Sequence, residues 1–215
     1  MKRTLYAAGT ALCLLLLLSV ILCAAVTRMG RDGGLYARCF HAFADTRRFG
    51  VPESDYDGIA SDLGDYFSGG AADFPYFNGR ERAHLADIRQ LFRAFDKAWL
   101  LLAAALPLAF ALIRRPDAKG FFLGFGLAVL LPGAAALYAA LDFENAFILT
   151  HRLLFSNDLW LLDPNTDLLI CLMPEPMFTF LAGRLAAVVI PAWLLIPTLC
   201  ILGGKIKRSS SRCAK

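Results

Sequence analysis

Four long apolar runs, almost free of charged residues, alternate with polar segments along this chain. They are Leu5–Val26, Ala98–Ile113, Phe121–Leu141 and Leu185–Leu202. A helix needs roughly 20 apolar residues to cross a bilayer, so each run predicts one span, although the second is short. The first run is longer than the roughly 7–15-residue core of a signal peptide, so we expect it to remain as an anchor. The pattern predicts an all-α membrane protein with four transmembrane helices.

The polar segment at about 28–97 also carries helical patterns. Pro52-Glu53-Ser54 predicts the start of one helix, and Gly69-Gly70 predicts its end. A further helix is predicted from Arg80 into the second span. Together with the segment at about 142–184, these helices form a cap over the spans.

Basic residues predict which side of the membrane each segment faces. They gather at the two ends and in the short loop between the second and third spans, as Lys2, Arg3, Arg114, Arg115, Lys119, Lys205, Lys207, Arg208, Arg212 and Lys215. By the positive-inside rule these regions are cytoplasmic. We therefore expect a multi-pass plasma-membrane protein with both termini in the cytoplasm and the helical cap extracytoplasmic.

Composition agrees with this class of protein. The 215 residues are 58% apolar, and the mean hydropathy is +0.55. That is too apolar for an ordinary soluble domain. The net charge of +4 follows from the basic inner regions and does not indicate a nucleic-acid partner.

The cysteines allow one disulfide between the predicted outer segments. Of six cysteines, only Cys39 and Cys171 lie in the predicted outer segments, one in each. Outside the cytoplasm such a pair can form a disulfide. The alternative is that both are free packing residues.

Two of the three histidines lie in polar stretches beside predicted spans, which suggests acid/base chemistry at a bilayer surface. His84 and Asp87 are three residues apart on a predicted helix, so the carboxylate can orient the imidazole. The alternative is a polar surface pair. We expect the third histidine, His41, to be a packed helix residue.

His151 precedes a dense polar stretch. Within it lie Asn157, Asp158, Trp160, Asp163, Asn165, Thr166 and Asp167. These residues predict a polar pocket with an aromatic wall, or alternatively an interfacial loop with solvated acids. We expect the third span to continue as helix through about Phe155. Continuous helices would then raise His84 and His151 to similar heights, but spacing alone does not show that they meet.

Common catalytic and metal-binding motifs are absent from the sequence. There is no His-x-His, His-Glu-x-x-His or Cys-x-x-Cys pattern and no Gly-x-Ser-x-Gly nucleophile motif. We therefore expect no metal, no cofactor and no serine nucleophile.

Most of the chain, roughly residues 1–205, resembles the lipoprotein intramolecular transacylase family of four-span bacterial membrane proteins. The resemblance is carried by Phe49-Gly50-Val51, by the stretch Arg82-Ala83-His84-Leu85-Ala86-Asp87-Ile88, and by His151-x3-Phe155-x-Asn157-Asp158-x-Trp160-x2-Asp163-Pro164-x-Thr166-Asp167 followed by Pro174-Glu175.

That resemblance implies a reaction and its residues. An acyl chain moves from the sn-2 oxygen of the diacylglyceryl group of a bacterial lipoprotein to the α-amine of the same N-terminal cysteine. The catalytic pair corresponds to His84 and His151. Substrate-binding or orienting roles are expected for Asp87, Asn157, Asp158, Trp160, Asp163 and Asp167. The expected partners are diacylated lipoproteins and membrane lipid.

Two other functions stay open at this point. One is a membrane lipid hydrolase or metal-dependent lipid enzyme, and the other is a non-catalytic module that binds lipid or lipoprotein.

Histidine base catalysis predicts an activity that falls below about pH 6.

Overall fold

The described residues of the chain fold into eight α-helices and two short 3-10 helices. A computed structural model describes residues 2–112 and 118–213, and no strand occurs in these ranges. The helices are α1 (Lys2–Met29), α2 (Gly33–Phe43), η1 (Arg47–Phe49), η2 (Glu53–Asp55), α3 (Tyr56–Ser68), α4 (Gly79–Leu112), α5 (Ala118–Leu141), α6 (Phe143–Leu154), α7 (Leu168–Leu172) and α8 (Glu175–Cys213).

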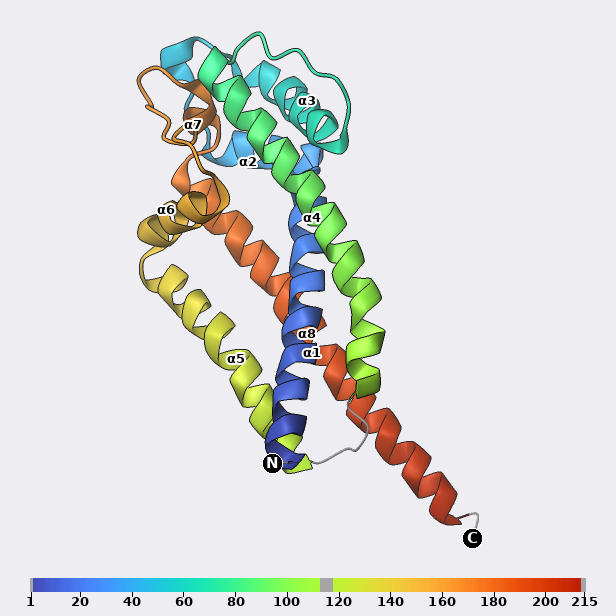
Figure 1. Cartoon of the computed structure of the whole chain (residues 1–215). Helices are drawn as coiled ribbons and strands as arrows, with labels where there is room; N and C mark the ends of the chain where they lie inside the picture. The colour runs from blue at the N-terminus through green and yellow to red at the C-terminus, as the bar shows by residue number, and fades with distance from the viewer. Residues whose placement is uncertain (1, 113–117, 214–215) are drawn as a thin grey trace.

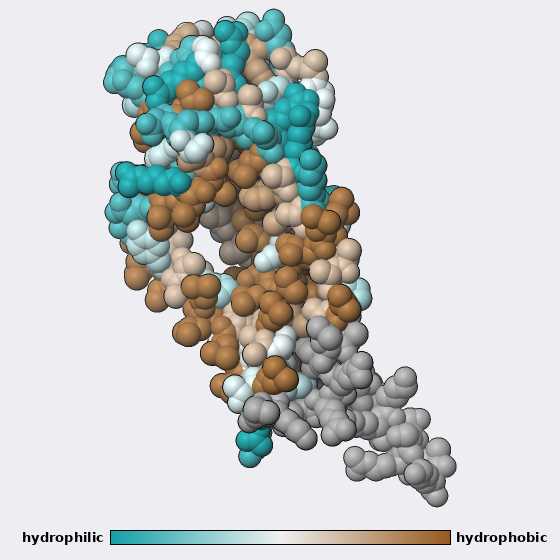
Figure 2. All heavy atoms as spheres, viewed as in Figure 1, coloured by the Kyte–Doolittle hydropathy of each residue, from teal (hydrophilic) through white to brown (hydrophobic). Residues whose placement is uncertain are grey.

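Long helices form one end of the molecule, and short helices form the other. α1, α5, α8 and the C-terminal part of α4 run lengthwise, while α2, α3, α7 and the start of α4 form a compact unit at one end (Figure 1), which we call the polar head. The surface is mainly hydrophilic over the polar head and mainly apolar over the long helices (Figure 2). A molecule with these two zones fits a bilayer around the long helices.

Among the described residues, three helices are long and apolar enough to cross a membrane by length and composition. They are Arg3–Met29 in α1, Lys119–Leu141 in α5 and Glu175–Leu195 in α8. The second predicted span, 98–113, falls on the C-terminal part of α4, and its last residue lies outside the described residues. Arg114 and Arg115 of the predicted inner loop, and Lys215 of the tail, also lie outside them.

α1 is the central helix among the long ones, packing against α4, α5 and α8. The Trp193 indole of α8 donates a hydrogen bond of 2.8 Å to the Leu14 carbonyl of α1. Gly124 of α5 lies so close to α1 that an added Cβ would come within 2.4 Å of the Ala7 carbonyl oxygen. Small residues therefore allow the backbones of α1 and α5 to approach each other.

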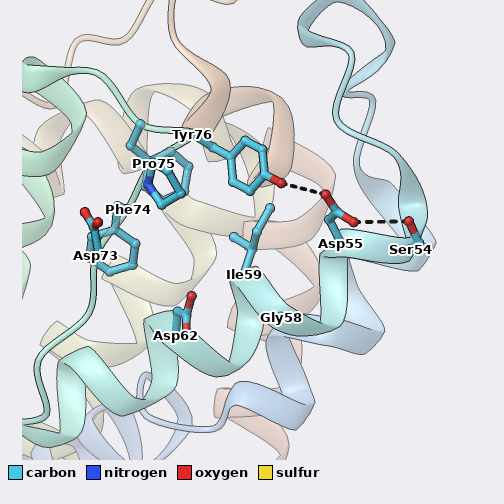
Figure 3. Close-up of a pocket in the computed structure, with 10 residues that line it drawn as sticks. Ser54, Asp55, Gly58, Ile59, Asp62, Asp73, Phe74, Pro75 and Tyr76 are labelled. Carbon is cyan, nitrogen blue, oxygen red and sulfur yellow. Dashed lines mark hydrogen bonds between the residues drawn. The ribbon is translucent and has the colours of Figure 1, made fainter.

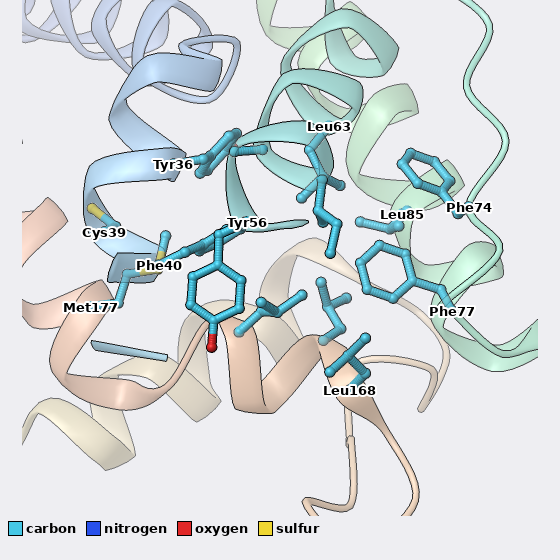
Figure 4. Packing of buried hydrophobic residues seen from close by; sticks show 14 of the residues in the cluster. Tyr36, Cys39, Phe40, Tyr56, Leu63, Phe74, Phe77, Leu85, Leu168 and Met177 are labelled. Atoms are coloured by element: carbon cyan, nitrogen blue, oxygen red, sulfur yellow. The ribbon is translucent and has the colours of Figure 1, made fainter. Parts of the chain in front are cut away.

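The polar head has its own hydrophobic core. Phe40 of α2, Leu63 of α3, Leu85 of α4, Leu168 of α7 and Met177 of α8 are all fully buried and pack in one cluster, part of which Figure 4 shows. Because every element of the head contributes to this cluster, it holds α4 in a fixed position relative to α7 and α8.

The predicted helices of the first polar segment are confirmed. α3 ends at Ser68 and is capped by Gly69, whose φ of 112° lies in the left-handed region that glycine tolerates best. α4 runs without a break from Gly79 to Leu112, as expected for a helix leading into the second span.

The prediction that the third span continues as helix through about Phe155 was wrong. α5 ends at Leu141, and Asp142 starts a separate helix, α6, by accepting a hydrogen bond of 3.2 Å from the Asn145 amide. α6 turns away from the axis of α5 (Figure 1). Asp142 adopts a non-helical φ of −149°, so its cap both breaks the helix and allows the turn.

α8 begins at Glu175, ten residues before the predicted start of the fourth span at Leu185. Pro176 lies in the first turn of α8, where the missing N–H of proline has no helical partner to lose.

Cys39 and Cys171 are both free thiols, so the second of the two alternatives left open by the sequence holds and the possible disulfide is not formed. The buried Cys39 thiol lies on α2, within the electrostatic reach of Arg184 and Arg38. The Cys171 thiol on α7 instead lies 3.6 Å from the Pro164 carbonyl oxygen, which accepts its weak hydrogen bond. The two thiols therefore have different surroundings.

Candidate active site

The start of α4 is built around a reciprocal cap. The Asn78 side-chain oxygen accepts hydrogen bonds from the amides of Arg80 and Glu81, at 2.8 and 3.0 Å. In return, one Glu81 carboxylate oxygen accepts a bond of 2.7 Å from the Asn78 amide. This is a capping box, which satisfies the free N–H groups of a helix start. It fixes the first turn of α4, and His84 lies one turn further on.

Glu81 also ties α4 to the segment before α8. Its second carboxylate oxygen accepts a bond of 2.6 Å from the Leu169 amide at the start of α7. Nearby, the carboxylate of the buried Asp167 accepts bonds of 2.7 Å from the Asn78 side chain and from the Asp163 amide. Burial is the main cause that raises the pKa of Glu81. The roles of Asn78 and Glu81 were not predicted from the sequence, although their three-residue spacing is typical of a capping box.

His84 projects from α4 into a position where it is almost completely covered, with 5% of its surface exposed. Its Nδ1 atom is buried and has no hydrogen-bond partner among the described residues. Burial first, and the nearby His151 second, lower the pKa of His84 to about 4, although Asp87 opposes the shift. His84 is therefore neutral at pH 7, and one of its nitrogens remains unsatisfied.

His151 lies in the last turn of α6, and its own helix orients it. Its Nδ1 is 2.9 Å from the Phe147 carbonyl oxygen, one turn earlier. A carbonyl oxygen only accepts, so Nδ1 carries the proton and the other ring nitrogen, Nε2, keeps its lone pair. Burial lowers the pKa of His151, against the opposing effect of the Phe147 hydrogen bond.

The fold brings the two histidines together. The ring centroids of His84 and His151 are 6.4 Å apart. Phe155 contacts both rings, with its centroid 5.2 Å from His84 and 5.7 Å from His151. Phe147 and Trp160 lie on the His151 ring, at 4.0 and 5.1 Å. Two neutral imidazoles thus share a site with aromatic walls, and sequence reasoning had predicted only the Trp160 wall.

The predicted orienting residues divide into two groups. Asp87 does not hydrogen-bond His84; its carboxylate accepts a bond of 2.9 Å from the Asn157 side chain, which links the segment after α6 to α4. Asp87, Asn157 and Trp160 form the first group, which lies beside the two histidines. Asp158 is exposed, and its backbone carbonyl accepts a bond of 2.5 Å from Arg80.

Asp163 and Asp167 serve the polar head instead. Asp163 is exposed, and its carboxylate accepts bonds from the backbone and side chain of Asn165, which lower its pKa. Asp167 is buried in the network with Asn78 described above. His41 was expected to be packed, but it is exposed on α2, where its Nε2 lies 3.1 Å from an Asp57 carboxylate oxygen.

Two surface cavities lie away from the histidines. One of about 340 Å³ lies between α3 and the segment that precedes α4, where the Tyr76 hydroxyl donates a bond of 2.6 Å to Asp55 (Figure 3). The other, of about 590 Å³, lies where Phe43 and Arg48 face Cys171. The molecule also has an opening between α5 and α6 on one side and the other long helices on the other, bordered by apolar surface (Figure 2). The two imidazoles together can offer a proton donor and a proton acceptor.

The fold and the site together define a class: a helical membrane protein with two neutral histidines, one buried and one partly buried, that face each other beside its apolar helices. The family model of the lipoprotein intramolecular transacylase Lit matches residues 9–178. This chain therefore belongs to the Lit family, whose members are acyltransferases.

Solved structures agree with the family assignment at the level of the fold. The in meso structure of the membrane integral lipoprotein intramolecular transacylase Lit from Bacillus cereus is 22% identical, with a TM-score of 0.73, over 96% of this chain and 98% of that one. Two variants of the same protein, with a histidine replaced by arginine or by alanine, are also 22% identical, with TM-scores of 0.71 and 0.70. They cover 97% and 96% of this chain, and 95% and 96% of theirs. No curated protein sequence matches the chain.

Proposed function

We propose that this protein moves an acyl chain within a bacterial lipoprotein, from the sn-2 oxygen of its diacylglyceryl group to the α-amine of its N-terminal cysteine. The observation that carries this proposal is the pairing of His84 and His151, with ring centroids 6.4 Å apart, in a member of the Lit family. The described residues around the pair supply proton donors and acceptors. The substrate amine is itself the nucleophile, so the reaction needs no nucleophilic side chain from the enzyme.

His151 is suited to be the base. Its Nδ1 proton is held by the Phe147 carbonyl, which leaves the Nε2 lone pair free to accept a proton from the substrate amine. The amine nitrogen then attacks the ester carbonyl carbon, the bond from that carbon to the sn-2 oxygen breaks, and an amide forms. A proton returns to the departing sn-2 oxygen, so the product carries one N-linked acyl chain and one free glyceryl hydroxyl.

His84 is suited to deliver that proton, because it can take up at one ring nitrogen the proton that His151 accepted while it donates from the other, which leaves both rings neutral. Its ring is neutral and covered, so its N–H is a hydrogen-bond donor in a water-poor site, where such a donor stabilises developing negative charge strongly. Asn157 and Trp160 provide further N–H donors on the same side. Both reacting groups belong to one substrate, so much of the rate enhancement comes from holding the amine next to the ester.

The membrane arrangement supports a lipid substrate. We propose that the C-terminal part of α4 forms a fourth span beside α1, α5 and α8, that both termini are cytoplasmic, and that the polar head is extracytoplasmic. Acyl chains would then reach the histidines from the bilayer through the apolar opening beside α6 (Figure 2).

The test is mass spectrometry of a lipoprotein. The chain is expressed in a bacterium that makes only diacylated lipoproteins, and the N-terminal peptide of one lipoprotein is fragmented. One acyl chain on the amine and one on the glyceryl group are expected. An unchanged diacylglyceryl peptide, with the protein present in the membrane, would contradict the proposal, and release of free fatty acid would indicate a hydrolase.

A further inference from the structure

α6 carries His151, yet this helix buries little of its own surface. None of the residues of α6 (Phe143–Leu154) is buried by the rest of the described chain. A helix is normally fixed in a fold by the packing of one apolar face against its neighbours. The direction of the His151 ring therefore depends on the few side chains that connect α6 and the segment after it to other elements.

Hydrogen bonds fix the segment that follows α6 to the start of α4. The Asn157 side chain donates to the Asp87 carboxylate, and Arg80 donates to the Asp158 carbonyl oxygen. Towards α8, by contrast, no hydrogen bond between described residues holds α6. There the helix is connected by a contact between aromatic rings.

This contact is part of a series of rings that leads from α8 to His151. The Phe147 ring lies on the His151 ring, with centroids 4.0 Å apart, and the Phe178 ring of α8 lies 4.9 Å from Phe147. Among the ring contacts of Phe147 within the described residues, only the one with Phe178 reaches outside α6. The Phe147 carbonyl also holds the His151 Nδ1 proton, so the ring and the backbone of one residue both orient the imidazole.

Phe178 itself lies on a well-supported part of α8. It directly follows Met177, which is fully buried in the core of the polar head. Further along α8, the Trp193 indole is hydrogen-bonded to α1. α8 is thus held in both places, so Phe178 gives α6 a fixed surface to pack against.

We propose that Phe178 is a positioning residue of the histidine site, which holds Phe147 and, through it, keeps the His151 ring opposite His84. Phe178 acts through Phe147 and not on the reacting atoms. The proposal rests on the function proposed above, because it gives Phe178 a part in orienting the base of that reaction. Reacting groups are sensitive to small displacements, and a shift of about 1 Å can lower a rate by roughly 10²-fold.

Loss of the Phe178 ring should also change the solvation of His151. Burial is the main cause that lowers the pKa of His151. Without Phe178 the Phe147 ring can move and let water reach the imidazole, so the pKa of His151 should rise toward its ordinary value. The titratable group that faces His151 is His84, on which Asp87 acts in turn. Both remain in a Phe178 variant, so a change in pKa would report the loss of the ring.

The experiment is a pH titration by NMR of the full chain, isotope-labelled at histidine and purified in detergent. The His151 signal is assigned by its absence in His151→Gln. Phe178→Ala is compared with wild type and with Phe180→Ala as the matched control. Phe180 lies on the same helix, but two residues correspond to about 200° of rotation, and its ring packs on Phe43 of α2, at 5.7 Å. Thermal unfolding checks that each variant is folded, and Phe178→Leu replaces Phe178→Ala if the latter does not fold.

The pKa of His151 is expected to be higher in Phe178→Ala than in wild type, and unchanged in Phe180→Ala. The kcat of acyl transfer should fall roughly ten- to hundredfold in Phe178→Ala, and Phe178→Tyr, which keeps the ring, should restore most of it. An unchanged His151 pKa in Phe178→Ala would overturn the proposal, and so would an equal rise in Phe180→Ala.

The titration needs no acyl transfer, so it separates this proposal from the function proposed above. A folded wild type that transfers no acyl chain would contradict that function, while the titration would still decide whether Phe178 positions His151.

Discussion

Two buried polar side chains, one turn apart on α4, have opposite surroundings. Glu81 is 1% exposed, and both of its carboxylate oxygens accept backbone hydrogen bonds, from Asn78 and Leu169. His84 is 5% exposed, and its Nδ1 has no partner among the described residues. The same helix therefore carries one polar group that is fully satisfied and another that is not.

The difference indicates a structural role for Glu81 and a chemical role for His84. Buried polar groups are almost always hydrogen-bonded, because an unsatisfied one costs roughly 1–3 kcal/mol. Glu81 follows that rule and anchors α4 to α7. His84 departs from it, in a family of acyltransferases, and its neighbour is a second histidine. We infer that the unsatisfied nitrogen is kept for a substrate.

Removal of either histidine should give the largest effect. Because each is expected to transfer a proton in the reaction, His84→Ala and His151→Ala should lower the rate of acyl transfer by roughly 10²–10⁴-fold. The rate is measured as N-acylated lipoprotein peptide formed over time. His41→Ala is the matched control, since this third histidine is exposed on α2, and it should stay near wild type. A wild-type rate in either variant of the pair would refute the assignment.

Removal of Glu81 should chiefly lower stability. Glu81→Ala leaves the buried amides of Asn78 and Leu169 without acceptors, so we expect a loss of about 2–4 kcal/mol in the free energy of unfolding. His84→Ala should cost less, because it also removes an unsatisfied nitrogen. Thermal unfolding of the purified protein in detergent compares the two. If His84→Ala is the more destabilising, the contrast between the two side chains is wrong.

The pH dependence should reflect the burial of the pair. The pKa of His84 is lowered to about 4 and that of His151 is also lowered, so both rings stay neutral at pH values that would protonate a free imidazole. The acid limb of kcat/KM should therefore fall below the pH 6 that the sequence suggested. For stability the sign is the same: the unfolded chain takes up protons near pH 6.5 and the folded chain does not, so stability present above pH 6.5 is lost as the pH falls toward 4.

Rates from pH 4 to 8, with chemistry rate-limiting, test this expectation. A midpoint at or above 6.5 would show that the reacting histidine is not desolvated.

Loss of one hydrogen bond beside the pair should give the smallest effect. Asn157→Ala breaks the bond to Asp87 that links the segment after α6 to α4. This bond is exposed, so we expect about a fivefold loss of rate, equivalent to about 1 kcal/mol. Asn165→Ala, in an exposed turn outside the histidine site, is the control and should leave the rate unchanged. Similar losses in both variants would mean that the bond to Asp87 has no special role.

Local patterns predicted the helical elements of this molecule well. Apolar runs located the long helices, Gly69 marked the end of α3, and polar stretches pointed to His84 and His151. Each of these signals depends on residues within a few turns of one another, so the sequence carries them without knowledge of the fold.

Contacts between distant segments were not predictable in the same way. The sequence allowed a disulfide between Cys39 and Cys171, but packing puts the two thiols in different surroundings. It also paired Asp87 with His84 by helical spacing, whereas the Asp87 carboxylate accepts its hydrogen bond from Asn157, seventy residues further along the chain.

The sequence by itself determined that this is a helical membrane protein with two histidines beside its apolar helices, because hydropathy and helical spacing are local properties. Only the tertiary structure decided that the histidines meet. The Asp142 cap breaks the chain between α5 and α6 and lets α6 turn toward α4, while Glu81 holds α4 in place from the other side. Burial then follows from the packing of Phe155 and Trp160 around the pair, and burial is what keeps both rings neutral.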